Sequence, residues 1–403
     1  MKMLSKFLGV ICFLITLFTG CTLHEPEQDL GNQFIPYTDN QYYYKLAEMQ
    51  GSSMAESEDG YYTLVDGYLY VKNKDTGEII PACNKPDCMH NDAEFNSDGS
   101  SNCNAYIGVA LGLEYYNHKL YFMTGRHEVF EMDKSGTTRK KLLELREPAR
   151  SMMVHRGYLY ISYYNAGKYP TEYTDEELKE LKCWVSRYRL DNWDGKAETV
   201  YEISEKYAQL FHMFAYGNRA YFSVSEAETT YTIIYNIIDH SVEKEEELIS
   251  YLTPANGKLL HFVPSGIPID KNATPEENVA RKEKQMAVLS DLQGNLIQKT
   301  EIPMTYSNLF GNETLIAADN ESYAGYGGIP AEDRGIRFYD GDAKLIREIK
   351  LNQEEARYVI GMNEDYLFYE VKNDHDGTDI WAIDLHKLDD PDLKGEPFFV
   401  SEE

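Results

Sequence analysis

Hydrophobic and polar residues alternate in short runs along most of the chain, and one phrase of this kind recurs seven times. Each copy is a β-branched and aromatic run that ends at Asp or Asn, a pattern typical of a strand entering a turn. The copies end at Asn73, Asp133, Asp191, Asp239, Asp291, Asp340 and Asp384. Their mean spacing is about 52 residues, in the range of propeller blades.

The third copy shows a complete unit, with four strands predicted over 152–155, 158–162, 184–190 and 199–203. Turns between the third and fourth strands contain Asp or Asn followed by Gly, as in Asp194-Gly195, which favours hairpins. Four-stranded antiparallel units repeated around a ring form a β-propeller, whereas a many-stranded sandwich needs no unit of constant internal order. We therefore predict an all-β fold, a β-propeller of seven four-stranded blades, as a single domain over residues 34–403.

The first unit lacks an obvious first strand between Glu58 and Tyr61. The aromatic run 41–46 is the candidate to supply it. Alternatively, this run joins the last blade and closes the ring.

Long insertions separate the second and third strands in four units, over residues 165–182, 265–284, 321–334 and 373–378. Two of them contain predicted short helices, at 174–182 and 274–284. Because these loops share one face of a propeller, the insertions decorate one face, which often marks the binding side of a repeat protein.

Candidate ligand-binding residues lie in or beside these insertions. They are Tyr164, Tyr169, Tyr323, Tyr326, Asp333, Arg334, Asp374, His375 and Asp376. Aromatic rings near acids and an arginine suit stacking on sugar rings or gripping a peptide. The same tyrosines can equally pack the insertions onto the blades.

The N-terminus begins with basic residues and continues into an apolar run over 7–18. The run ends at Thr19-Gly20, directly before Cys21. A membrane span needs ~20 apolar residues, so residues 1–20 are interpreted as a secretory signal peptide. Residues 21–33 are mostly polar and turn-rich, as expected of a tether.

The segment 17–21 resembles the lipobox of bacterial lipoproteins, although Phe18 is bulkier than the family's usual residue. The resemblance implies that Cys21 is acylated and becomes the mature N-terminus. The protein would then be exposed outside the cytoplasm and would contact the bacterial membrane only through its lipid anchor. The alternative is a plain secretory signal with an incidental cysteine.

The formal net charge is −28, and loss of Lys2 and Lys6 with the signal makes it −30. A field of this sign repels nucleic acid and anionic lipid headgroups, which argues against both as partners. It attracts cations and basic peptides. Acidity also keeps an exported protein soluble, which is an equally good reason for the charge.

A cluster of potential metal ligands follows the fourth strand of the first unit: Cys83, Cys88, His90 and Cys103. Three thiols and an imidazole can bind Zn²⁺ tetrahedrally as a structural Cys₃His site. Disulfides are the competing interpretation, because an exported protein meets an oxidising environment, and Cys183 then completes a set of four. A catalytic thiol is disfavoured, since only His90 lies nearby in sequence as a base.

The motif Cys-x-Lys-Pro-Asp-Cys-x-His at 83–90 is followed by Cys103-Asn104-Ala105-Tyr106. Together with the lipobox and the Tyr-rich repeats, it resembles a group of largely uncharacterised bacterial surface lipoproteins with predicted propeller domains. The blade phrase also resembles the repeats of TolB-like and quinoprotein-like propellers. Neither resemblance implies catalytic residues, and the TolB-like one implies a scaffold or binding role in the envelope.

Three functions fit these observations: a propeller that binds or senses a glycan or peptide, a propeller glycan hydrolase or lyase, and an envelope scaffold for another protein. The sequence contains no Gly-rich phosphate loop, no Gly-x-Ser-x-Gly elbow and no His-Glu-x-x-His helix. Their absence weakens the enzyme hypothesis, so we expect a binding protein. Ligand identity does not follow from the fold.

Overall fold

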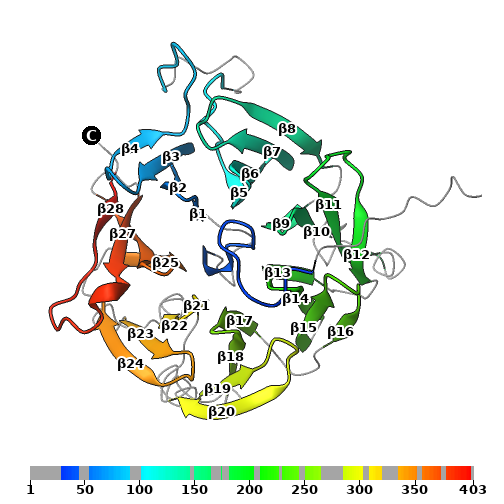
Figure 1. Ribbon diagram of the computed structural model, residues 1–403, viewed down its shortest axis with the longest axis vertical. Coiled ribbons are helices and arrows are strands. Elements are labelled where there is room, and N and C mark those ends of the chain that lie inside the picture. Colours follow the sequence, from blue (N-terminus) through cyan, green and yellow to red (C-terminus); the bar gives the residue numbers. More distant parts are fainter. Residues whose placement is uncertain are drawn as a thin grey trace, which may run out of the picture. The chain divides into compact units, whose positions relative to one another are not determined.

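The computed structural model describes residues 29–44, 54–90, 101–145, 149–164, 174, 181–203, 209–226, 229–244, 250–264, 285–302, 308–319, 335–351, 356–373 and 378–400. Contacts divide the chain into two compact units, Met1–Leu30 and Gly31–Glu403. The second unit contains seven four-stranded antiparallel sheets arranged in a ring (Figure 1). The protein is therefore an all-β propeller, which confirms the predicted fold and the number of blades.

Each blade uses four strands that are consecutive in sequence. The innermost strands are β1 (Met54–Glu56), β5 (Ala110–Tyr116), β9 (Ala149–His155), β13 (Gln209–Tyr216), β17 (Ser250–Ala255), β21 (Asn308–Gly311) and β25 (Ala356–Met362). The second strands are β2 (Gly60–Val65), β6 (Lys119–Thr124), β10 (Tyr158–Tyr164), β14 (Arg219–Glu226), β18 (Lys258–Pro264), β22 (Leu315–Asp319) and β26 (Tyr366–Lys372). The third strands are β3 (Tyr68–Asn73), β7 (Glu128–Asp133), β11 (Cys183–Arg189), β15 (Thr229–Asn236), β19 (Gln285–Ser290), β23 (Gly335–Asp340) and β27 (Thr378–Asp384). The outermost strands are β4 (Ile79–Pro81), β8 (Arg139–Glu144), β12 (Glu198–Ile203), β16 (Val242–Lys244), β20 (Leu296–Ile302), β24 (Leu345–Lys350) and β28 (Glu396–Phe399).

The blades are held together by side chains that alternate along each strand. In β14, Phe222 packs in a cluster with Tyr160 and Val185 of the third blade. Its neighbour Tyr221 packs in a different cluster, with Leu259 of the fifth blade. Because successive strand residues point to opposite faces of the sheet, both faces of a blade become buried between neighbours.

In several blades the Asp that ends the repeated phrase closes the turn to the outermost strand. Asp133 Oδ1 accepts a hydrogen bond of 3.0 Å from Ser135 N, and Asp340 Oδ1 accepts one of 3.0 Å from Asp342 N. In the fourth blade this role belongs to Asn236, whose Oδ1 accepts a 3.0 Å bond from Ile238 N. The phrase of this blade therefore ends three residues earlier than Asp239, the position expected from sequence.

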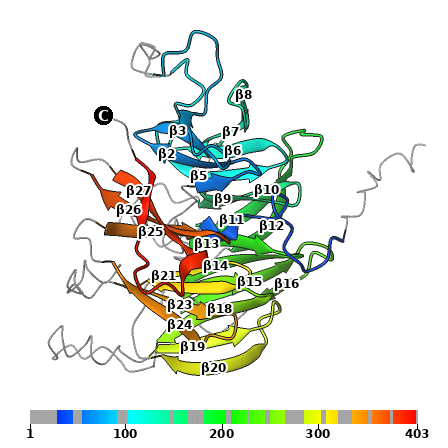
Figure 2. The same ribbon diagram turned by 60° about the vertical axis from the view of Figure 1, so that its left-hand side comes forward.

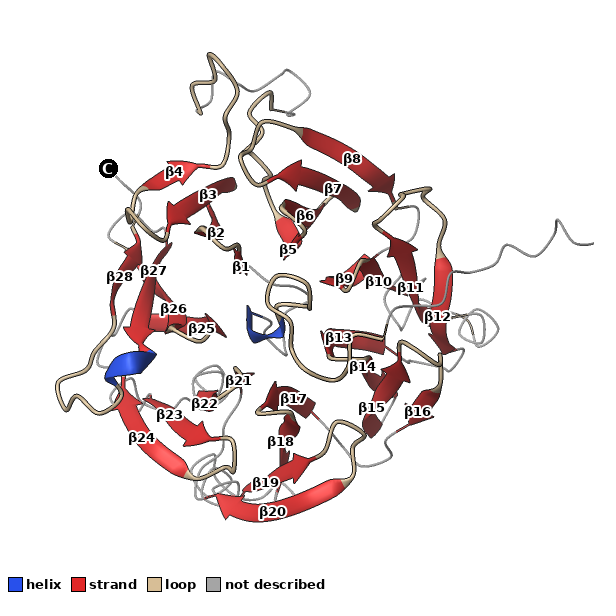
Figure 3. Cartoon of the chain, in the orientation of Figure 1, coloured by secondary structure: helices blue, strands red, loops and turns tan. Residues whose placement is uncertain are grey.

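The segment 34–44, called here the axial plug, lies inside the ring of innermost strands (Figure 3). It ends in a 3₁₀ turn, η1 (Tyr42–Tyr44), whose three tyrosines are buried. The prediction that 41–46 forms a strand is wrong for its described part, 41–44. The first strand of blade one is β1, and the polar run Asp39-Asn40-Gln41 is buried by partners that only the ring supplies.

No strand crosses between the first and last blades in the described chain, because β25 to β28 form a complete sheet and β1 to β4 another. Side chains join them instead. The Lys72 ammonium donates a 2.7 Å hydrogen bond to the Phe398 carbonyl and lies 4.0 Å from the centre of the Phe398 ring. The rings of Tyr61 and Phe398 pack edge to face, with centroids 5.2 Å apart. The ring is thus closed by packing rather than by strand exchange.

The two faces of the ring differ in their loops. The turn face carries the turns from first to second and from third to fourth strands, such as Arg156-Gly157. The insertion face carries the turns from second to third strands and the links between blades. The four long insertions leave the blades after Tyr164, Pro264, Asp319 and Asn373, all at the insertion face. The predicted helices 174–182 and 274–284 lie almost wholly outside the described residues.

A second 3₁₀ turn, η6 (Leu385–Lys387), follows β27. Within the described residues, no helix is both long and apolar enough to cross a membrane.

Candidate functional site

The four predicted metal ligands come together in an excursion of the chain that leaves the rim of the first blade, beside β4 and β8 (Figures 1 and 2). Cys83 and Cys103 are buried, whereas Cys88 and His90 are partly exposed. Asp87 and His90 adopt positive φ angles of 65° and 53°. Both residues therefore lie in the left-handed region of backbone conformation, which is uncommon for residues other than glycine.

The donor atoms of Cys83, Cys88, His90 and Cys103 all lie within 4.8 Å of one another. Cys103 Sγ and His90 Nδ1 are 3.5 Å apart. A tetrahedral zinc ion with Zn–S of about 2.3 Å and Zn–N of about 2.0 Å separates sulfur from nitrogen by about 3.5 Å. The cluster can therefore hold a metal such as zinc.

The surroundings of the two buried thiols differ. Burial raises the pKa of Cys83, but backbone amides of Lys85 and Asn104 point at its sulfur and bring the pKa below its usual value. Burial, together with the nearby Cys88 thiol, raises the pKa of Cys103 to about 12. Amides directed at a sulfur stabilise a thiolate, which is the form that binds metal.

None of the four described cysteines forms a disulfide. Cys183 is buried in a core cluster of the third and fourth blades, with Val185 and Phe222. Cys83 and Cys103 belong to a separate small cluster with Ala105. Cys183 is therefore not a partner of the Cys–His cluster.

The axial plug is fixed by polar contacts to the innermost strands. Asn40 is fully buried and bonds three blades: its backbone N–H donates to His155 Nδ1 at 3.0 Å, its side chain donates to Glu114 at 3.0 Å, and its Oδ1 accepts from Ala215 N at 3.2 Å. Both oxygens of Asp39 accept from the Arg156 guanidinium, at 2.6 and 3.0 Å. The plug thus closes the axis at the turn face.

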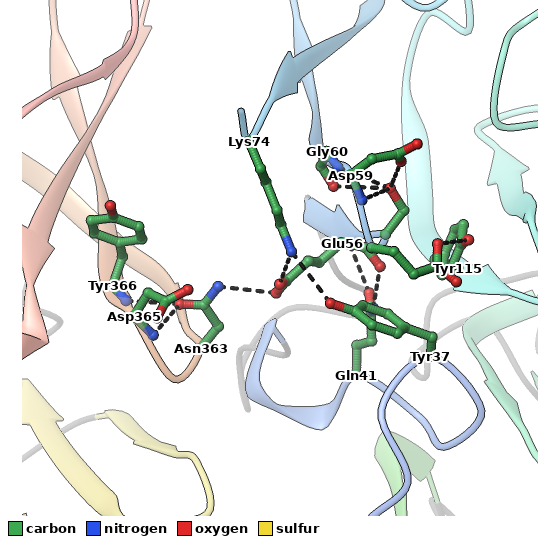
Figure 4. A network of polar contacts seen from close by, with 12 residues as sticks. Tyr37, Gln41, Glu56, Asp59, Gly60, Lys74, Tyr115, Asn363, Asp365 and Tyr366 are labelled. Carbon is green, nitrogen blue, oxygen red and sulfur yellow. Dashed lines mark hydrogen bonds and ion pairs between the residues drawn. The ribbon is translucent and has the colours of Figure 1, made fainter. Parts of the chain in front are cut away.

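Glu56 is the centre of the polar network between the plug and the first and last blades (Figure 4). Its carboxylate accepts from the Lys74 ammonium at 2.5 Å, from Tyr44 Oη at 2.8 Å and from Asn363 Nδ2 at 2.9 Å. The side-chain amide of Gln41 hydrogen-bonds the backbone N–H and the backbone carbonyl of Glu56. All of these contacts are structural, because both carboxylate oxygens are occupied by protein donors.

A second carboxylate at the axis is used in the same way. Glu313 accepts from the hydroxyls of Tyr42 at 3.0 Å and Tyr216 at 2.9 Å. Its backbone N–H donates to Glu364, 2.9 Å away. Burial raises the pKa of Glu364, and the neighbouring Glu313 adds to this.

A groove of about 630 Å³ lies between the first and last blades, on the turn face. Tyr61, Tyr366 and Phe398 supply aromatic surface, and Lys72 and Asp384 are among its charged lining residues. Burial lowers the pKa of Lys72, whose ammonium contacts the carbonyl and the ring of Phe398. Aromatic rings beside hydrogen-bonding groups can hold a polar ligand.

Among the predicted ligand-binding residues, only Tyr164 is described. It is the last residue of β10, is 7% exposed, and packs in the core cluster that contains Cys183. The others lie outside the described residues: Tyr169, Tyr323, Tyr326, Asp333, Arg334, Asp374, His375 and Asp376, as does Cys21.

Sequence reasoning missed the residues that close the axis: Asn40, Glu56, Glu313 and Asn363. The available signal was the polar run Asp39-Asn40-Gln41 directly before three tyrosines. Such a run reads as a surface turn unless the ring around it is known.

The sequence matches no protein-family model and no curated protein. Its fold is similar to that of solved propellers. Tricorn protease aligns with a TM-score of 0.53 and 12% identity, over 92% of this chain and 36% of its own. Pyrococcus horikoshii acylaminoacyl peptidase aligns with a TM-score of 0.51 and 12% identity, over 92% and 54%.

An oligogalacturonate lyase in complex with manganese aligns with a TM-score of 0.53 and 8% identity, over 87% of this chain and 91% of its own. The chain thus spans a third to a half of the two peptidases and most of the lyase. At these identities the likeness establishes the fold alone. This chain is a β-propeller similar to propellers found in both peptide- and glycan-processing proteins.

Proposed function

We propose that this chain is a lipid-anchored extracytoplasmic propeller that binds a glycan or a peptide on its insertion face, and that it carries a structural zinc ion at the Cys–His cluster. The observation that carries the proposal is the closed axis. Because the plug fills the turn-face end of the axis, the insertion face is where a ligand can reach the centre of the ring. The four insertions leave the blades at that same face.

The hydrogen bonding of the axial carboxylates favours binding over catalysis. A glycosidase needs two carboxyl groups free to exchange protons or attack the substrate. Among the described residues, Asp39, Glu56 and Glu313 each have both oxygens bonded to protein donors. These groups hold the plug and are not available to a substrate.

The ligand class comes from the comparisons, as an analogy. The similar solved structures include peptidases and an oligogalacturonate lyase. Peptides and glycans are both extended polymers, and an insertion-bearing face offers a broad surface to either. The charge of −28 disfavours nucleic acid as the ligand.

The lipid anchor is the second part of this proposal. It is supported by the lipobox-like segment 17–21, which predicts that Cys21 is acylated.

The zinc ion serves structure in this proposal. Cys83, Cys88, His90 and Cys103 supply four protein donors, which fill a tetrahedral site and leave no open position for a substrate. Closed sites of this kind stabilise a fold.

The experiment is a glycan-array and peptide-library screen with the purified protein, followed by mapping of any hit. Tyr326→Ala, Arg334→Ala and His375→Ala should each weaken binding, by about 1–3 kcal/mol for a central anchor. Gln293→Ala is the matched control, because Gln293 is exposed in a turn of the opposite face.

Three results would contradict the proposal. Loss of binding in Gln293→Ala but in none of the insertion variants would assign the ligand to the turn face. Weakened binding in Lys72→Met and Tyr366→Ala alone would place the ligand in the groove between the first and last blades. Release of a cleaved product from a bound polymer would instead establish an enzyme.

A further inference from the structure

The outer edge of the first blade is assembled from two separate pieces of chain. Ala82 N donates a 2.8 Å hydrogen bond to the Leu69 carbonyl, and Leu69 N donates a 2.8 Å bond to the Ala105 carbonyl. Tyr106 then pairs with Tyr68 in an antiparallel bridge. One residue of β3, Leu69, is thus bonded both to the residue before the excursion and to the residue after it.

The Cys–His cluster sits at the base of this excursion. Cys83 directly follows Ala82, and Cys103 lies two residues before Ala105. Their sulfurs lie within 4.8 Å of each other, although roughly 20 residues of chain separate them. We infer that the zinc ion acts as a splice: it joins Cys83 to Cys103 and makes the two pieces behave as one continuous outer edge.

The physical reason is the entropy of loop closure. Without a cross-link, bringing Ala82 and Ala105 to the same residue closes a loop of about 20 residues, which costs loop-closure entropy. A β-edge as short as the three residues of β4 cannot offset this with its own hydrogen bonds. A metal that binds both ends fixes the loop at its base, and Cys88 and His90 complete the ligand set from within the loop.

The spliced segment also joins the first blade to the second. Asn104 Nδ2 donates to the carbonyls of Gly136 and Thr137, at 2.8 and 3.1 Å, and Asn84 N donates to the Gly136 carbonyl at 3.3 Å. A Cβ on Gly136 would lie 2.2 Å from the Ala82 carbonyl oxygen, and its φ is +70°. Glycine is therefore required where the turn from β7 to β8 meets the segment.

Arg139 of β8 completes this seam. Its guanidinium donates to the Tyr106 carbonyl at 2.5 Å and lies over the Phe130 ring at 4.5 Å. The contacts of this seam include Asn104 and Tyr106, which lie close to Cys103 in sequence. Zinc removal should therefore loosen the seam between the first and second blades, while more distant blades stay folded.

The test uses the purified full-length protein and zinc itself. After reduction and removal of metal, the protein should bind one equivalent of Zn²⁺, and Co²⁺ should give the absorption of a tetrahedral thiolate site. Cys88→Ser and His90→Ala should lose this binding. Cys183→Ser is the control and should keep it, because Cys183 lies in a different core cluster.

Hydrogen exchange then tests the splice. On zinc removal, the amides of Leu69, Ala82 and Ile107 should lose about tenfold or more in protection, whereas that of Phe222 in the fourth blade should not change. Metal binding with unchanged exchange at Leu69 and Ala82 would overturn the splice. No metal binding by the reduced protein, or a Cys83–Cys103 disulfide in the protein as isolated, would overturn the zinc site as well.

This inference rests on the structural zinc ion of the proposed function and not on ligand binding. A ligand screen without hits leaves the metal titration and the exchange experiment unaffected. Conversely, a protein that binds a ligand but no zinc would keep the binding function and lose the splice.

Discussion

Asn363 in the last blade donates a 2.9 Å hydrogen bond to the carboxylate of Glu56 in the first blade. This bond crosses the point where the ring closes, and no shared strand supports it among the described residues. Tyr44 of the axial plug donates to the same carboxylate. The plug and the ring closure are therefore parts of one network, and changes in either should weaken both.

Glu56→Ala should destabilise the protein strongly. It leaves the Lys74 ammonium, the Tyr44 hydroxyl and the Asn363 amide without their shared acceptor, in a site where the Glu56 side chain is only 10% exposed. Breaking a buried pair costs about 3 kcal/mol. Urea unfolding measures the loss.

Asp342→Ala is the control for this variant. Asp342 also pairs with a lysine, at 2.7 Å, but its side chain is 75% exposed. An exposed pair contributes less than about 1 kcal/mol. Equal effects of the two variants would refute a structural role for the axial network.

Gly361→Ala should displace the plug. A Cβ at this position would lie 2.6 Å from Cδ1 and 3.0 Å from Cα of Tyr44, so the backbone of the plug would have to move. We expect a loss of about 1–3 kcal/mol and faster proteolysis within residues 34–44. Gly125→Ala is the control, because its Cβ would meet only ordinary contacts at 3.6 Å or more. Unchanged proteolysis in Gly361→Ala would mean that the plug does not depend on this contact.

Stability should fall as the solution is acidified from pH 7 to pH 4, in part because of His155. Its Nδ1 accepts from Asn40 N and its Nε2 donates to the Gly217 carbonyl, which defines a neutral ring. Burial lowers the pKa of His155 from 6.5 to about 4. As the pH falls, His155 therefore becomes protonated in the unfolded chain before it does so in the folded protein. The stability that this residue contributes above pH 6.5 is lost as the pH falls toward 4.

Between pH 7 and pH 5 this single group should cost about 2 kcal/mol. His155→Asn keeps an oxygen acceptor near Asn40 N but does not titrate, so urea unfolding of this variant should show a shallower loss over the same range. His261, also buried and with its pKa lowered to about 4, contributes in both proteins. Identical pH profiles for the variant and the natural protein would contradict the role given to His155.

Cys21→Ala should release the protein from the membrane fraction, because it removes the residue that the lipobox-like segment presents for acylation. Fractionation of cells that express the variant measures the release. Cys12→Ala is a matched control within the signal peptide and should leave the protein membrane-bound. Membrane association that survives Cys21→Ala would exclude this cysteine as the anchor.

The sequence by itself determined the blades. Strand alternation and the Asp or Asn at the end of most third strands act over a few residues, so they can be recognised without knowing what lies across the ring. The Cys–His cluster was also visible, because Cys83, Cys88 and His90 are close in sequence and a metal site needs only that their ligand atoms converge.

Only the tertiary structure decided how the axis and the rim are completed. Asn40 meets partners in three different blades, and Leu69 bonds Ala82 and Ala105 on either side of a long excursion. Tyr164 ends a strand in the core, although it stands at the start of an insertion. In each case the partners are far apart in the chain, and the hydrophobic burial that closes the ring is what brings them together.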